Sequence, residues 1–97
     1  MKHISYQELK QWQDSNKDFQ LIDVREPNES AAYSIGGELI PLNFLIRNPA
    51  KVDVSKPVVV YCKRGIRSQL AIQRLSTRLP EADFYNLANG IYALFHG

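Results

Sequence analysis

One cysteine, Cys62, stands where a strongly apolar segment gives way to a short basic loop. The apolar segment, Pro57 to Cys62, contains three consecutive valines, whose branched side chains suit a buried strand. The loop Lys63-Arg64-Gly65-Ile66-Arg67 then places three cations within five residues. Its glycine can adopt a positive φ angle, and a helix is predicted to begin at about Ser68.

The chemistry that this arrangement favours is nucleophilic attack by sulfur. Loop N–H groups and the positive end of a helix dipole together favour an anion at the cysteine sulfur, so the thiolate of Cys62 is favoured over the thiol. The neighbouring cations provide a site for an anionic substrate. Taken alone, a cysteine that ends an apolar strand is more often a buried hydrophobic residue. A structural cysteine requires no basic loop, however, and we therefore predict a nucleophile.

The composition is that of one small globular protein. With 97 residues, 44% of them apolar, we expect a single domain over residues 1–97. A net charge of +2 is too weak to indicate nucleic-acid binding. A lone cysteine excludes an internal disulfide and a multi-cysteine zinc site, and we predict no metal and no cofactor. His3 and His96 are predicted to be bystanders near the termini.

No segment of the sequence indicates targeting to a membrane. The first six residues lack the apolar stretch of a signal peptide, and no apolar run approaches the roughly 20 residues that span a bilayer. The sequence therefore predicts a cytoplasmic protein without membrane contact.

Helix and strand signals alternate along the chain. The first helix begins with the spacing of a capping box, Ser5 and Glu8, and Pro27 suits the start of the second. This alternation predicts an α/β fold with a mainly parallel sheet and helices on both faces. Cys62 lies at the carboxyl end of its strand, where such sheets bind ligands. The predicted elements are helix 6–14, strand 19–24, helix 27–33, strand 39–40, a loop over 43–52 with room for one helical turn, strand 57–62, helix 68–79, strand 83–87 and helix 91–95.

Four segments of the chain resemble, in the same order, the signatures of the rhodanese family. The resemblance implies a rhodanese fold, with a central five-stranded parallel sheet flanked by helices, and a catalytic Cys62. It implies that Asp23 and Arg25 brace the cysteine loop or form a structural ion pair rather than touch substrate. The substrate-binding loop that it implies consists of Lys63, Arg64, Gly65, Ile66, Arg67 and Ser68. The four segments are Leu21 to Glu29, Gly37 to Leu42, Val58 to Ser68 and Asn86 to Ile91.

The resemblance also implies a sulfurtransferase. In the implied cycle the Cys62 thiolate takes the outer sulfur of thiosulfate or of another persulfide and releases sulfite or a thiol. The resulting persulfide lasts until a thiol or cyanide acceptor removes the sulfur. The implied partners are a small anionic donor such as thiosulfate and a thiol or protein acceptor, with no nucleic acid and no membrane.

Two other functions are alternatives to a sulfurtransferase. A related class of similar fold removes phosphate, but its cysteine loop is one residue longer than the six residues from Cys62 to Arg67. A non-enzymatic rhodanese-like module that binds a partner or senses redox state remains the alternative. The chain departs from the family pattern at Ser34 to Glu38, at Asn89-Gly90 and at Leu94, and we expect these departures to lie away from the cysteine loop.

Overall fold

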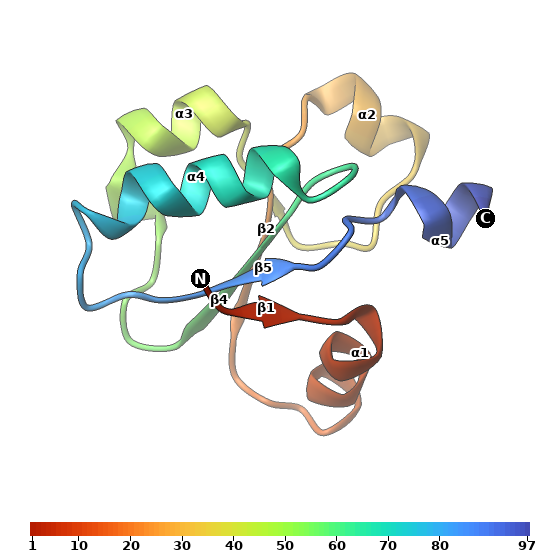
Figure 1. Cartoon of the computed structure of the whole chain (residues 1–97), viewed down its shortest axis with the longest axis horizontal. Helices are drawn as coiled ribbons and strands as arrows, with labels where there is room; N and C mark the ends of the chain where they lie inside the picture. Colours follow the sequence, from red (N-terminus) through yellow and green to blue (C-terminus); the bar gives the residue numbers. More distant parts are fainter.

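Five parallel strands form one sheet, in the order β1-β5-β4-β2-β3, in a computed structural model that describes residues 1–97 (Figure 1). All four strand pairings are parallel, which confirms the predicted parallel sheet. Strand β4 occupies the centre of the sheet, so its carboxyl end lies in the middle of that edge. The strands are β1 (His3–Ile4), β2 (Gln20–Asp23), β3 (Glu38–Leu39), β4 (Pro57–Tyr61) and β5 (Asp83–Leu87).

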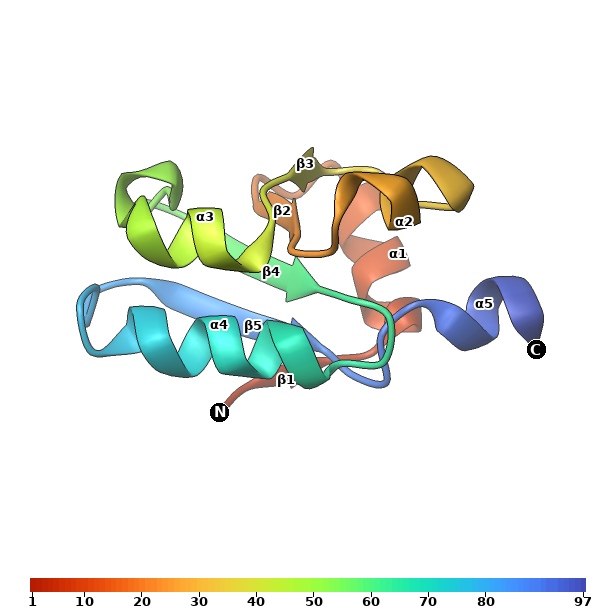
Figure 2. The same cartoon turned by 90° about the horizontal axis from the view of Figure 1, so that it is seen from above.

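Helices cover both faces of the sheet, as predicted. In Figure 1, α3 and α4 lie above the sheet and α1 lies below it. Figure 2 shows α2 and α5 at the end of the molecule toward which the strand arrows point. None of these helices has the length and hydropathy needed to cross a bilayer. The helices are α1 (Tyr6–Asp14), α2 (Pro27–Ala32), α3 (Leu42–Arg47), α4 (Ile66–Ser76) and α5 (Tyr92–His96), and a 3-10 turn spans Pro49–Lys51.

Strand β4 is buried on both faces, which explains its uninterrupted apolar sequence. Val58 and Val60 pack in a core with α3 and α4, whereas Val59 and Tyr61 pack in a second core that includes Leu9 of α1. The two cores hold β4 between two helical layers. The strand is therefore a rigid support for the residue that follows it.

Three elements differ most from the sequence prediction, and the others, apart from α1 and β5, differ by one residue at one or both ends. The segment predicted as a loop from Asn43 forms helix α3, which begins after Pro41 and buries Leu45. Helix α4 begins at Ile66 rather than Ser68, because Gly65 adopts a left-handed conformation as its N-cap, and it ends at Ser76 rather than Leu79. Strand β1 was not predicted. It has only two residues and exists through pairing with β5.

Candidate active site

Cys62 directly follows β4 and is only 1% exposed. Its Sγ accepts hydrogen bonds from the backbone N–H of Gly65 at 3.1 Å and of Ser68 at 3.3 Å. Gly65 has a φ of +87°, a conformation that glycine adopts without the steric cost other residues incur. The loop thus curls around the sulfur and leads directly into α4.

A small open pocket of about 280 Å³ lies at Cys62. Its other lining residues are Lys63, Arg64, Ile66 and Arg67. The backbone N–H groups of these four residues donate no hydrogen bond within the protein. An anion in the pocket can satisfy such donors at the start of a helix. The loop therefore combines a sulfur atom with unused donors around it.

The last turn before α5 fixes the base of the cysteine loop. The N–H of Ile91 donates to the carbonyl oxygens of Cys62 and Lys63, at 3.2 and 3.0 Å. The N–H of Tyr92 donates to the same carbonyl oxygen of Lys63 at 2.9 Å. These carbonyls thus face α5. Gly90 has a φ of +64°, and a Cβ at this position would lie 2.3 Å from the Lys63 oxygen.

The expectation that Asn89-Gly90 lies away from the cysteine loop is wrong, because Gly90 contacts Lys63. Asn89 has a φ of +66°, in the left-handed region that asparagine tolerates better than most residues. Asparagine can therefore replace the first of two family glycines here without changing the path of the chain.

Arg67 forms a two-pronged ion pair with Glu29 of α2. Both terminal nitrogens of Arg67 lie 2.7 Å from a carboxylate oxygen of Glu29. These hydrogen bonds outweigh partial burial and lower the pKa of Glu29 from 4.5 to about 2. Glu29 also accepts from the N–H of Glu26, which caps α2. The remaining N–H groups of the guanidinium are free for an anion.

The substitution Glu29→Gln is expected to lower the free energy of unfolding by about 1 kcal/mol at pH 7. Glutamine keeps an acceptor for the N–H of Glu26 but lacks the charge that binds Arg67. Because folding lowers the pKa of Glu29, the wild-type carboxylate adds stability above pH 4.5, and this stability is lost as the pH falls toward 2.

Urea unfolding of both proteins between pH 7 and pH 2 measures this difference. Glu81→Gln is the matched control, since Glu81 is exposed and forms no ion pair. A gap between wild type and Glu29→Gln that stays constant down to pH 2 would contradict the assignment.

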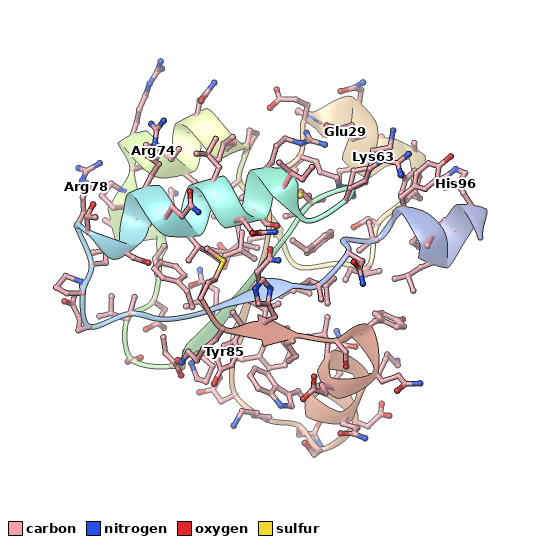
Figure 3. All side chains as sticks on the ribbon, viewed as in Figure 1. Glu29, Lys63, Arg74, Arg78, Tyr85 and His96 are labelled. Atoms are coloured by element: carbon pink, nitrogen blue, oxygen red, sulfur yellow. The ribbon has the colours of Figure 1, made fainter.

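The other two cations of the loop stand at its rim. Arg64 lies over the ring of Tyr92, with its guanidinium carbon 4.3 Å from the ring centre, and the Lys63 ammonium lies 5.1 Å from the same centre. Figure 3 shows Lys63 between α4 and α5. Such cation–π contacts hold both charges against α5, beside the pocket that these two residues line.

The buried pair Asp23 and Arg25 supports α2 rather than touching the cysteine loop. Arg25 is fully buried and donates to both carboxylate oxygens of Asp23 at 2.9 Å. It also donates to the carbonyl oxygens of Glu29 at 3.4 Å and Tyr33 at 2.8 Å. Burial disfavours the charged form of Arg25, but the hydrogen bonds and charge of Asp23 outweigh it and raise its pKa. The hydrogen bonds of the pair lead toward the loop through α2 and Glu29.

A series of polar contacts, buried at Cys62, Ser68 and Asn86, leads from the cysteine to the exposed His3 in β1. The Ser68 hydroxyl lies 3.3 Å from Cys62 Sγ and donates to Asn86 Oδ1 in β5. The Asn86 amide nitrogen lies 3.3 Å from His3 Nδ1. From the sequence, Asn86 has no predicted role and His3 is predicted to be a bystander. The available signal was a polar residue inside the predicted strand 83–87, and a polar side chain that such a strand buries requires hydrogen-bonding partners.

Comparison with known proteins identifies the family. A profile of the rhodanese-like domain matches residues 5–95, and the chain belongs to this family. The crystal structure of a rhodanese-like domain protein from Staphylococcus aureus matches with a TM-score of 0.84 and 29% identity. The match covers 96% of this chain and 90% of that one, which confirms the rhodanese fold.

Relatives of known sequence include domains of sulfurtransferases. The probable adenylyltransferase/sulfurtransferase MoeZ of Mycobacterium tuberculosis is 36% identical over 93 residues, covering 93% of this chain. The uncharacterized protein YqhL of Bacillus subtilis is 40% identical over 72 residues, covering 73% of this chain. The chain spans 24% of MoeZ and 56% of YqhL.

Proposed function

We propose that this protein is a sulfurtransferase that carries a sulfane sulfur as a persulfide on Cys62. The observation that carries the proposal is the set of N–H donors around the sulfur. Cys62 Sγ accepts hydrogen bonds from two loop N–H groups, and four further N–H groups around its pocket have no acceptor within the protein. A persulfide adds one sulfur atom beyond Sγ, toward those donors. Its negative charge is the kind that preorganised N–H groups stabilise.

The donor in this proposal is thiosulfate or another persulfide. The Cys62 thiolate attacks the outer sulfur of thiosulfate, a new S–S bond forms, and sulfite leaves with the electrons of the broken S–S bond. A thiolate or cyanide then attacks the outer sulfur of the persulfide and regenerates the Cys62 thiolate. No metal, cofactor or general base takes part in this cycle.

The remaining site residues are proposed to act through charge and position. The amides of residues 63–68 bind the developing anion, and Gly65 permits the curvature that directs them. Arg67, held by Glu29, orients an anionic donor with its free N–H groups. Lys63 and Arg64 attract the donor to the entrance, and Asp23 and Arg25 stabilise α2, which carries Glu29.

The test is intact mass spectrometry after brief treatment with thiosulfate, followed by cyanide. We expect the wild-type protein to gain one sulfur atom and to release it to cyanide as thiocyanate. Cys62→Ser is the matched control and should gain none, since it removes the only thiol in the chain. The same experiment with glutathione persulfide tests the second donor class. If neither donor adds sulfur to the wild type, the enzyme proposal fails and the non-enzymatic module replaces it.

A further inference from the structure

The surface that leads away from the cysteine pocket is formed by one stripe of side chains. We define the α4 face as Lys63, Arg64, Ile66, Leu70, Arg74 and Arg78. Positions 66, 70 and 74 are four residues apart and follow one side of α4. Arg78 lies two residues beyond the end of the helix, where it donates to the carbonyl oxygen of Ile46 in α3 at 2.7 Å. Figure 3 shows Lys63 at the cysteine end of α4, with Arg74 and Arg78 toward the other end.

The α4 face carries positive charge without acidic neighbours in sequence. No aspartate or glutamate occurs between Asp53 and Glu81, and none of the four cations on the face forms a salt bridge. All ten aspartates and glutamates of the chain lie outside this segment, although the net charge of the whole chain is only +2. A surface with this charge distribution is complementary to an acidic partner.

Two apolar side chains lie on the same face, next to the pocket. Ile66 is 73% exposed and lines the cysteine pocket, and Leu70 is 37% exposed one turn further along. Both also line a shallow groove with Gln69 and Gln73. Apolar contacts at the centre with charges toward the edge are typical of a protein interface. Nucleic acid and lipid present no thiol to the sulfur that these side chains surround.

From these observations we propose that the α4 face docks an acidic protein that accepts sulfur from Cys62. This inference rests on the sulfurtransferase function proposed above. The partner's thiolate attacks the outer sulfur of the Cys62 persulfide. A new S–S bond forms on the partner, the S–S bond to Cys62 breaks, and Cys62 leaves as a thiolate. The step exchanges one thiolate for another, so it requires no external oxidant or reductant.

A pair of synthetic peptides tests this docking. The acidic peptide contains one cysteine, a four-residue Gly/Ser spacer and four glutamates, and its control has glutamines instead. Ile66 and Arg74 are separated by about 12 Å along the helix, which four extended residues can span. Mass spectrometry follows transfer from the preloaded persulfide to each peptide. We expect the acidic peptide to react about tenfold faster at low salt, and this advantage to disappear at about 0.5 M NaCl.

Charge reversal locates the effect on the protein. The double variant Arg74→Glu/Arg78→Glu should lose the preference for the acidic peptide. The control variant Lys10→Glu/Lys17→Glu changes the net charge by the same amount, but on the other side of the sheet, at one residue of α1 and one residue just after it. This control should keep the preference for the acidic peptide. Transfer to 2-mercaptoethanol, a small neutral thiol, should be the same in all three proteins.

The outcomes separate the docking from the proposed function. Equal rates for both peptides, with normal transfer to 2-mercaptoethanol, would overturn the docking and leave the sulfurtransferase intact. Absence of transfer to any thiol would overturn both. Binding of a single-stranded oligonucleotide or of phosphatidylserine vesicles through Arg74 and Arg78, without a preference for the acidic peptide, would also overturn it.

Discussion

Replacing Arg25 with methionine is expected to lower the free energy of unfolding by about 3–5 kcal/mol, because it leaves the Asp23 carboxylate buried without its partner. The carbonyl oxygens of Glu29 and Tyr33 lose a donor in the same variant. Helix α2 then loses its attachment to the end of β2, and Glu29 loses its fixed position. Urea unfolding at pH 7 measures the loss.

Lys56→Met provides the matched control for Arg25→Met. Lys56 also pairs with aspartates, Asp18 and Asp53, but these carboxylates are substantially exposed. We expect this control to lose less than about 1 kcal/mol. The double variant Asp23→Asn/Arg25→Met removes the buried charge and should recover part of the stability. Equal losses for Arg25→Met and Lys56→Met would show that burial of the pair has no energetic consequence.

Gly90→Ala is expected to lower the free energy of unfolding by about 2–5 kcal/mol and to slow sulfur loading at Cys62. An alanine with positive φ costs roughly 1–2 kcal/mol, and insertion of a methyl group into packed structure costs roughly 1–3 kcal/mol more. The methyl group would meet the backbone of Lys63 and Arg64, so relief of the clash must move the cysteine loop.

Gly36→Ala separates backbone strain from displacement of the loop. Gly36 has a φ of +94°, but a Cβ at this position meets nothing within 4 Å. The control should therefore lose only the strain contribution and load sulfur at the wild-type rate. Urea unfolding and the thiosulfate mass assay, applied to both variants, give the comparison. A Gly90→Ala protein that loads sulfur as fast as Gly36→Ala would contradict the proposed anchoring of the loop.

The sequence predicted those elements whose signals are local. Strand 83–87 was predicted with the bounds of β5, and helix 6–14 with the bounds of α1, where both hydrogen bonds of the capping box are present. Strand β1 has no such signal, because its two residues are extended only through pairing with Asn86 and Leu87. Likewise, the start of α4 depends on the left-handed conformation of Gly65, for which no side-chain cap exists to be recognised.

The candidate site was predicted as far as it is contiguous in sequence. Cys62 and its loop follow one another along the chain, and the structure places them around one pocket. Glu29 is 38 residues from Arg67, and Asn86 is 18 residues from Ser68. Both contacts depend on how α2 and β5 meet the loop, which spacing within a segment cannot reveal.

The Ser68 hydroxyl has one proton and two neighbouring acceptors, Cys62 Sγ and Asn86 Oδ1, so it can donate to only one of them at a time. While the proton is donated to Asn86, the hydroxyl oxygen has only lone pairs to turn toward Cys62 Sγ. A hydroxyl that rotates to donate to Cys62 Sγ instead leaves Asn86 Oδ1 without this donor. The hydrogen bonding of a buried amide in β5 is thus coupled, through one hydroxyl, to the state of the sulfur at Cys62.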